Sequence, residues 1–186
     1  MDVKNLLYTE IDRMGTQNIR RKITENAENS KYIIEQIMKN CFKNLDKINI
    51  SSHDWISLAE ALTHYMLTTM LLPTQRKINF DGFEVSIVIP NTRNMIKNLK
   101  ETLIIQFYTA ENDIKTVLDH LVALQPLRQN IWIVSYLPIN NSIPIKNYVI
   151  LYQKNKDNKL VLPFSHLLID IAEYVQQINY SGFKIL

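Results

Sequence analysis

Residues 77–90 read KINFDGFEVSIVIP, and this stretch decides the fold class. Apolar and polar residues alternate on both sides of Asp81-Gly82, a dipeptide typical of tight turns between paired strands. The pattern therefore predicts an antiparallel hairpin with strands over 77–80 and 83–90. Residues 102–108, TLIIQFY, are rich in types that favour sheets and predict a third strand.

Helical patterns lie on both sides of these strands. Apolar residues recur at helical spacing before the hairpin and again after the third strand. Ser51 and Asp54 resemble a capping box that opens a helix, and Gly15 suits a helix C-terminus. The apolar spacing thins near residues 26–30, where we expect a bend. The predicted helices span 5–14, 16–45, 51–72, 112–125 and 163–178, and two further strands span 130–137 and 148–153.

The order of these elements predicts a mixed sheet. Strands joined by a short turn are antiparallel, whereas the helix over 112–125 supplies the long connection that a parallel pair needs. We therefore expect an α/β sandwich. Residues 1–50 are predicted to form an N-terminal helical extension, and residues 51–186 an α/β domain that ends in a C-terminal helix.

Composition excludes several functional classes. The chain has 186 residues, of which 46% are hydrophobic and 21% are charged, enough for a sizeable core. Its three glycines are too far apart for the phosphate loops of P-loop or Rossmann proteins. The single cysteine, Cys41, excludes an intrachain disulfide and a cysteine-based zinc cluster, and its place beside Phe42 predicts burial. No signal peptide or apolar span is recognisable, so we expect a cytoplasmic protein with no membrane contact.

Polar residues interrupt two of the predicted strands. Because side chains alternate across a strand, Glu84, Ser86 and Val88 share one face, as Gln106 and Tyr108 do in the third strand. If these faces align, they form a polar cluster that the preceding helix approaches. Buried polar groups need partners, so the cluster is an internal hydrogen-bond network, a ligand site or a catalytic site, with the network favoured. The candidate members are Glu60, His64, Glu84, Ser86, Gln106 and Tyr108.

The element order, with a strand that begins after Asp81-Gly82 and another that reads LIIQFY, resembles the restriction-endonuclease-like fold of the PD-(D/E)xK nuclease superfamily. The resemblance covers about residues 52–137 and implies a mixed-sheet core with the order αβββαβ. In that superfamily an acidic residue on the second strand and a Glu-x-Lys on the third converge at one sheet edge. The carboxylates hold a divalent metal, and the lysine helps to position or activate water.

The corresponding positions of this chain are neutral. Ser86 stands where the resemblance places the metal-binding aspartate, and Gln106 and Tyr108 stand where it places Glu and Lys. Mg²⁺ prefers carboxylate oxygens, so the loss of two acids lowers its affinity severely. The resemblance therefore implies a non-catalytic relative, with no metal or other cofactor, that acts by binding nucleic acid or a protein partner. The long helix and the C-terminal helix are candidate faces for such a partner or for a second copy of the chain.

Two other functions stay open from the residues alone. Glu60 and Glu84, with Asp81, would serve a divergent metal-dependent nuclease, and the polar cluster would serve a small-molecule sensor. The net charge of +3 allows a nucleic-acid partner. Cations that flank the hairpin are either phosphate contacts or ordinary surface residues. These cations are Arg76, Lys77, Arg93, Lys97 and Lys100.

Overall fold

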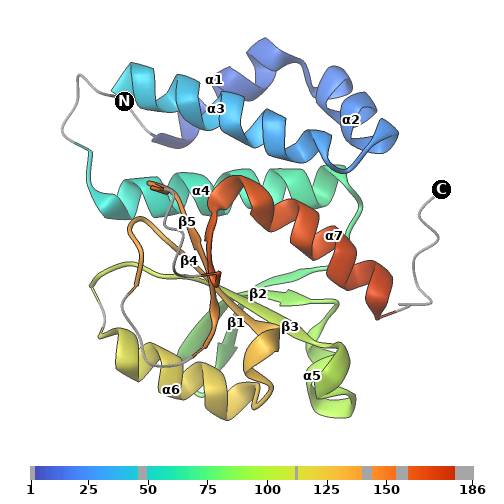
Figure 1. Cartoon of the computed structure of the whole chain (residues 1–186), viewed down its shortest axis with the longest axis vertical. Helices are drawn as coiled ribbons and strands as arrows, with labels where there is room; N and C mark the ends of the chain where they lie inside the picture. The colour runs from blue at the N-terminus through green and yellow to red at the C-terminus, as the bar shows by residue number, and fades with distance from the viewer. Residues whose placement is uncertain (1–2, 46–49, 112, 140–143, 154–158, 179–186) are drawn as a thin grey trace.

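The computed structural model describes residues 3–45, 50–111, 113–139, 144–153 and 159–178 (Figure 1). Its helices are α1 (Val3–Met14), α2 (Thr16–Glu25), α3 (Asn29–Leu45), α4 (Ser52–Thr69), α5 (Thr92–Lys97), α6 (Ile114–Leu124) and α7 (Leu167–Gln177), with 3₁₀ turns η1 (Leu99–Glu101), η2 (Arg128–Asn130) and η3 (Phe164–His166). Its strands are β1 (Gln75–Phe80), β2 (Phe83–Ile89), β3 (Leu103–Phe107), β4 (Ile131–Ser135), β5 (Lys146–Val149) and β6 (Val161–Pro163).

The strands form one mixed sheet in the order β1-β2-β3-β4-β5-β6. β1, β2 and β3 pair antiparallel, whereas β3, β4, β5 and β6 pair parallel. α6 connects β3 to β4, as a parallel pair requires. The hairpin turn lies at Asp81-Gly82, where φ is positive at both residues, 50° and 90°, a conformation that glycine adopts without a steric penalty. The predicted hairpin, meander and crossover are confirmed.

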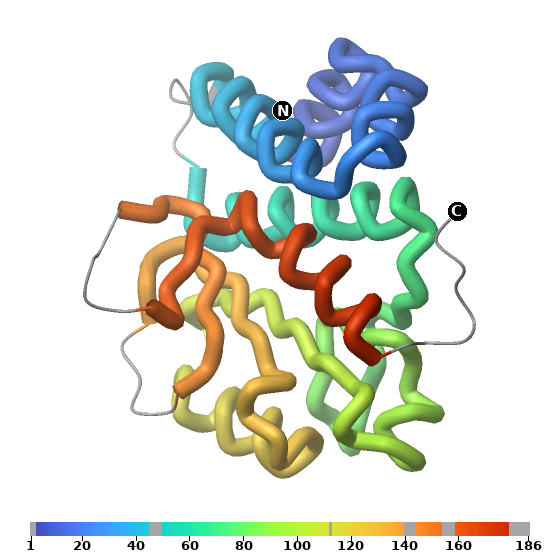
Figure 2. The backbone as a smooth tube through the Cα atoms, turned by 45° about the vertical axis from the view of Figure 1, so that its right-hand side comes forward, coloured from blue at the N-terminus to red at the C-terminus, as the bar shows by residue number. Residues whose placement is uncertain are grey.

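Helices cover both faces of the sheet (Figures 1 and 2). α6 packs on one face through a hydrophobic cluster that includes Val88, Ile104 and Leu121. α4 and α7 pack on the other face, and α1, α2 and α3 form a further layer beyond α4. The larger cluster on this side contains both Ile37 of α3 and Ile105 of β3. A continuous set of buried side chains thus joins the N-terminal helices to the sheet.

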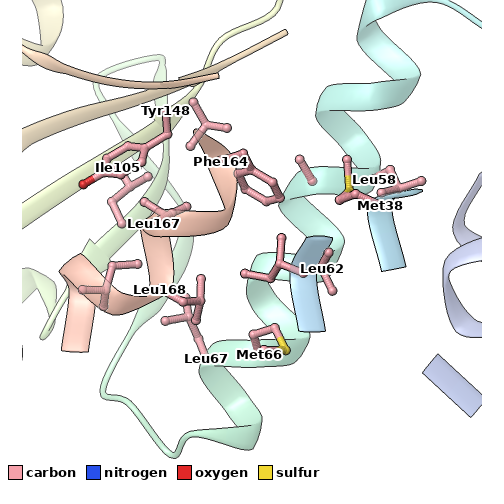
Figure 3. Close-up of a cluster of buried hydrophobic side chains, with 14 of the residues drawn as sticks. Met38, Leu58, Leu62, Met66, Leu67, Ile105, Tyr148, Phe164, Leu167 and Leu168 are labelled. Atoms are coloured by element: carbon pink, nitrogen blue, oxygen red, sulfur yellow. The ribbon is translucent and has the colours of Figure 1, made fainter. Parts of the chain in front are cut away.

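α4 is the central helix of this larger cluster (Figure 3). It begins at the predicted capping box, in which the Ser51 hydroxyl oxygen accepts the Asp54 N–H and the Asp54 carboxylate accepts the Ser51 N–H. Leu58, Leu62 and Met66 are completely buried, and each such side chain contributes roughly 1.5–3 kcal/mol. Figure 3 also shows the side chains of other elements in the cluster, Met38, Ile105, Tyr148, Phe164, Leu167 and Leu168.

The predicted long helix over 16–45 is two helices in the structure. Asn26 has an extended backbone, and its side chain accepts the Glu28 N–H at 2.9 Å. Asn29 Nδ2 donates to the Lys22 carbonyl at 2.7 Å. These side-chain hydrogen bonds compete with the helical ladder. The thin apolar spacing near residues 26–30 therefore marks a break between α2 and α3 rather than a bend.

Other element boundaries also differ from the prediction. β5 lies at 146–149 instead of 148–153, and β6 is missing from the sequence prediction because three residues that include a proline carry no periodic signal. The predicted polar connection over 91–100 contains α5, which Asn91 caps by accepting the Asn94 N–H. The predicted helix over 163–178 begins with η3 and becomes α-helical at Leu167. Residue 112, the predicted start of α6, lies outside the described residues.

The shared core predicts a single cooperative unfolding transition. Ile37→Ala and Ile105→Ala each leave a cavity in the same cluster, so each should lower the free energy of unfolding by about 2–5 kcal/mol. Urea denaturation followed by circular dichroism measures both shifts. Leu137→Ala is the control, because Leu137 is 57% exposed, and its truncation should cost less than about 1 kcal/mol. Two transitions, each moved by only one variant, would contradict the shared core and support residues 1–50 as the separate extension that the sequence predicts.

Candidate functional site

The hydrogen-bonded ladder between β2 and β3 ends just before Ser86 and Gln106. Its last pair joins Ile87 to Ile105. Beyond this pair, side chains replace the ladder: the Ser86 N–H donates to Gln106 Oε1 at 3.1 Å, and the Phe107 N–H donates to Ser86 Oγ at 3.1 Å. β3 stays paired with β4 here, so β2 and β3 separate at this point. We call it the fork.

The side chains of β2 change face at the fork. Val85 and Val88 both pack into the cluster on the α6 side, whereas Ile87 packs into the cluster on the α4 side. The register between β1 and β2 pairs Arg76 with Ile87 and Ile78 with Val85 but leaves out Lys77 and Ser86, and Lys77 has a φ of 48°. This left-handed conformation costs a residue that carries a side chain roughly 1–2 kcal/mol. The predicted single face for residues 84, 86 and 88 is therefore wrong, because strict alternation fails at Ser86.

A cleft of about 730 Å³ opens at the fork, between α4 and α6. Its walls come from three strands, β1, β2 and β3, and three helices, α1, α4 and α6, so it lies where the sheet meets helices of both its faces. The candidate cluster residues that line it are Glu60 from α4 and Glu84, Ser86, Gln106 and Tyr108 from the strands. The sixth candidate, His64, is not part of the lining.

A cation of the neighbouring strand engages Glu60. Glu60 Oε1 lies 3.6 Å from Arg76 Nη2, and the two side chains are only 19% and 28% exposed. Arg76 is therefore directed at α4. His64 lies one turn along α4 from Glu60, and its pKa is lowered, first by burial and then by the charge of Arg76, while Glu60 acts in the opposite sense. The neutral imidazole is the form that this environment favours.

The residues at the fork do not fit a divalent metal ion. The oxygens of Ser86 and Gln106 already accept backbone N–H groups, and Glu60 faces Arg76. Burial, followed by the charge of Asp113, raises the pKa of Tyr108, which keeps this side chain a neutral phenol. Across the described residues, no three His, Cys, Asp or Glu side chains gather in a way that would hold a metal. Hard cations need such anionic oxygens.

The predicted phosphate-contacting cations do not line one cavity. Only Lys77 lines the cleft at the fork. Arg93 lines a separate recess of about 370 Å³ beside Gln75. Lys97 and Lys100 are exposed on α5 and η1. Asp81, the third acid of the alternative nuclease hypothesis, lies in the hairpin turn and is not part of the cleft lining.

Sequence reasoning missed the α6 wall of the cleft. Asp113 caps α6 by accepting the Thr116 N–H and hydroxyl, both at 3.1 Å, and a capping pattern in the sequence would have found it. His120 stacks on Phe83 of β2 with ring centroids 4.8 Å apart and an interplanar angle of 5°. This contact joins residues far apart in sequence, and no local pattern signals it. Lys4 of α1 also lines the cleft, and the sequence carries no signal for it.

Cys41 is completely buried, as predicted. Burial, followed by the charge of Glu10, raises its pKa to about 12, so the thiol stays protonated and is a poor nucleophile. In the described part of the chain, every helix is too short or too polar to cross a membrane.

No protein-family model matches this chain, and no curated protein matches it. Among solved structures, metal-depleted Ecl18kI in complex with uncleaved, modified DNA is 16% identical, with a TM-score of 0.61 over 99% of this chain and 82% of that chain. Metal-depleted Ecl18kI with uncleaved DNA is 15% identical, with the same TM-score and coverage. A complex of restriction endonuclease PspGI with substrate DNA is 12% identical, with a TM-score of 0.54 over 95% of this chain and 94% of that chain. The chain has a restriction-endonuclease-like fold, which confirms the resemblance.

The fork predicts a structural cost for the loss of the Ser86 hydroxyl. Ser86→Ala leaves the Phe107 N–H without its acceptor, so the free energy of unfolding should fall by about 1–3 kcal/mol. Ser57→Ala is the matched control on the α4 wall of the cleft, and alanine is the better helix former there. Chemical denaturation of both variants measures the difference. Equal stability of the two variants would mean that the Ser86 hydrogen bond does not hold the fork.

His64 predicts that stability declines in mild acid. Its pKa is lowered in the folded protein, so below the unfolded value of about 6.5 the unfolded chain binds more protons and the free energy of unfolding falls as pH falls. At pH values above about 6.5, the contribution of His64 to the free energy of unfolding no longer changes with pH. Denaturation at about pH 7.5 and 5.5 should show a smaller loss for His64→Gln than for the wild type. The exposed His53→Gln is the control and should follow the wild-type profile; an unchanged loss in His64→Gln would contradict the assignment.

Proposed function

We propose that this chain binds DNA at the cleft beside the fork and does not hydrolyse it. The observation that carries this proposal is the use of the Ser86 and Gln106 oxygens as acceptors for backbone N–H groups. These two neutral side chains thus satisfy backbone N–H groups of the sheet, and they present no anionic oxygens to a metal. The DNA in the three complexes of similar fold supports the choice of ligand.

The arrangement of the helices favours nucleic acid over a protein partner. The sequence singled out the 16–45 region and the C-terminal helix as candidate association faces. In the structure α3 packs against α1, α2, α7 and η3, and α7 also packs against α4. Much of the apolar surface of both helices is therefore used within the chain. The cleft at the fork, by contrast, is lined by polar side chains from three helices and three strands.

A divergent nuclease is the alternative, because Glu60 and Glu84 line the same cleft. Its weakness is that Glu60 already faces Arg76 across 3.6 Å. Asp113 also lines the cleft, but its carboxylate accepts the Thr116 N–H and hydroxyl. Glu84 beside neutral oxygens makes a poor site for Mg²⁺.

Fluorescence anisotropy with labelled duplex and single-stranded DNA tests binding. The logarithm of the association constant should fall linearly with the logarithm of the salt concentration. The same DNA incubated with protein and Mg²⁺ or Mn²⁺ should remain intact. Absence of any salt-dependent affinity would refute DNA binding. Cleavage that disappears in Glu84→Ala would instead establish the nuclease.

A pair of lysine variants locates the binding face. Lys77→Asn removes a cation from the cleft and retains a residue that tolerates positive φ. It should weaken binding and reduce the magnitude of the salt slope by about 0.9, the value for one lost phosphate contact. Lys97→Asn removes the same charge from α5, outside the cleft lining, and should change neither quantity appreciably. A larger effect from Lys97 would place the DNA elsewhere.

A further inference from the structure

We infer that the fork is an anion site, in which the Ser86 hydroxyl and the Gln106 amide donate hydrogen bonds to a phosphate oxygen. This inference rests on the proposed function and names the group of DNA that the cleft recognises. A metal ion is bound by acceptor oxygens, whereas an anion is bound by hydrogen-bond donors. The hydrogen bonds at the fork determine whether donors or acceptors face the cleft.

The Gln106 amide presents its donor end to the cleft. Its Oε1 accepts the Ser86 N–H, and a backbone N–H can only donate, so the orientation of the amide group is fixed. The NH₂ group with its two hydrogens is left over. Among the described residues, no acceptor receives these hydrogens, and Gln106 lines the cleft.

The Ser86 hydroxyl also has a hydrogen-bond donor left over. One lone pair of its oxygen accepts the Phe107 N–H, and its own hydrogen remains to be donated. Ser86 is 6% exposed and also lines the cleft. A buried donor without an acceptor is unfavourable, so a ligand or solvent oxygen at this place is stabilised. Two neighbouring side chains that line the cleft therefore each retain hydrogens that a ligand there can accept.

The charges around the cleft permit an anion there. Lys4 and Lys77 line the cleft beside the acids Glu84 and Asp113. The Asp113 carboxylate accepts hydrogen bonds from the first turn of α6. The lining also contains a third acid, Glu60, so its acids outnumber its lysines by one.

The last acid of the lining, Glu60, faces a cation that lies outside the lining. Glu60 is matched by Arg76 at 3.6 Å. The remaining titratable groups on the helical walls are His53 and His120, and His120 directs its Nδ1 at the Thr116 carbonyl, 2.8 Å away. Neither histidine side chain adds a negative charge to the cleft. Oxygens of a phosphodiester, which accept hydrogen bonds and carry one negative charge, suit this environment better than a cation does.

Nuclear magnetic resonance tests the anion site directly. The side-chain NH₂ signals of Gln106 are assigned in ¹⁵N-labelled protein by their absence from Gln106→Glu. Titration with inorganic phosphate, and separately with duplex DNA, should shift these signals progressively and to saturation, while sodium chloride at equal ionic strength should not. Signals that stay in place during both titrations would overturn the inference.

Gln106→Glu provides the matching affinity measurement. Glutamate keeps an oxygen for the Ser86 N–H and replaces the donor group by an anionic acceptor. DNA affinity should fall about 10- to 100-fold, whereas Gln17→Glu, the same exchange on the exposed face of α2, should leave it within about twofold of the wild type. The loss should persist at higher salt, because screening removes general charge repulsion but not a missing hydrogen bond.

The outcomes separate this inference from the proposed function. Wild-type protein that binds DNA while Gln106→Glu binds equally well, or differs only at low salt, refutes the anion site and leaves DNA binding intact. Wild-type protein that binds phosphate at the Gln106 amide but no DNA refutes the proposed function and supports the anion site. Circular dichroism of Gln106→Glu checks that its fold is retained. If it is not, the wild-type titration with phosphate decides the inference by itself.

Discussion

Two backbone N–H groups at the end of the β2–β3 ladder need acceptors, and this requirement determines the chemistry of the cleft. Where paired strands separate, buried backbone donors lose their partners, and leaving them unpaired costs free energy. Here the side chains of Ser86 and Gln106 take over as acceptors. Their oxygens are thereby committed to the fold, and their hydrogens are left for a ligand. The same two contacts explain both why a metal does not fit and why an anion does.

The rest of the structure holds the fork open and in place. α4 is anchored in the large core that extends from the N-terminal helices to the sheet, and it carries Glu60 to one wall. Arg76, which the sequence suggested as a phosphate contact, instead balances Glu60 between helix and strand. Lys77 interrupts the register of β1 with β2 and has left-handed backbone geometry. Backbone strain of this kind persists only where surrounding packing enforces it.

The fold was accessible to sequence reasoning because its signals are local. The Asp81-Gly82 turn, the capping pair Ser51 and Asp54, and the pattern of Leu103–Phe107 each report on a few neighbouring residues. The neutral side chains of Ser86, Gln106 and Tyr108 are likewise visible in the sequence. Contacts between distant segments could not, such as the pairing of Glu60 with Arg76 or the stacking of His120 on Phe83. Nor does the sequence show that alternation fails at Ser86, since the tertiary contacts of β2 determine its face there.

The central claim is that the fork binds an anion and does not bind a divalent cation, and paramagnetic broadening by Mn²⁺ tests it most directly. Manganese bound near Glu84 and the fork would selectively broaden the backbone amide signals of Ser86 and Phe107, whose atoms form the fork. The account predicts that these two signals lose no more intensity than amides elsewhere in the chain, with or without DNA. Selective, saturable loss of both signals at low Mn²⁺ concentration would contradict it.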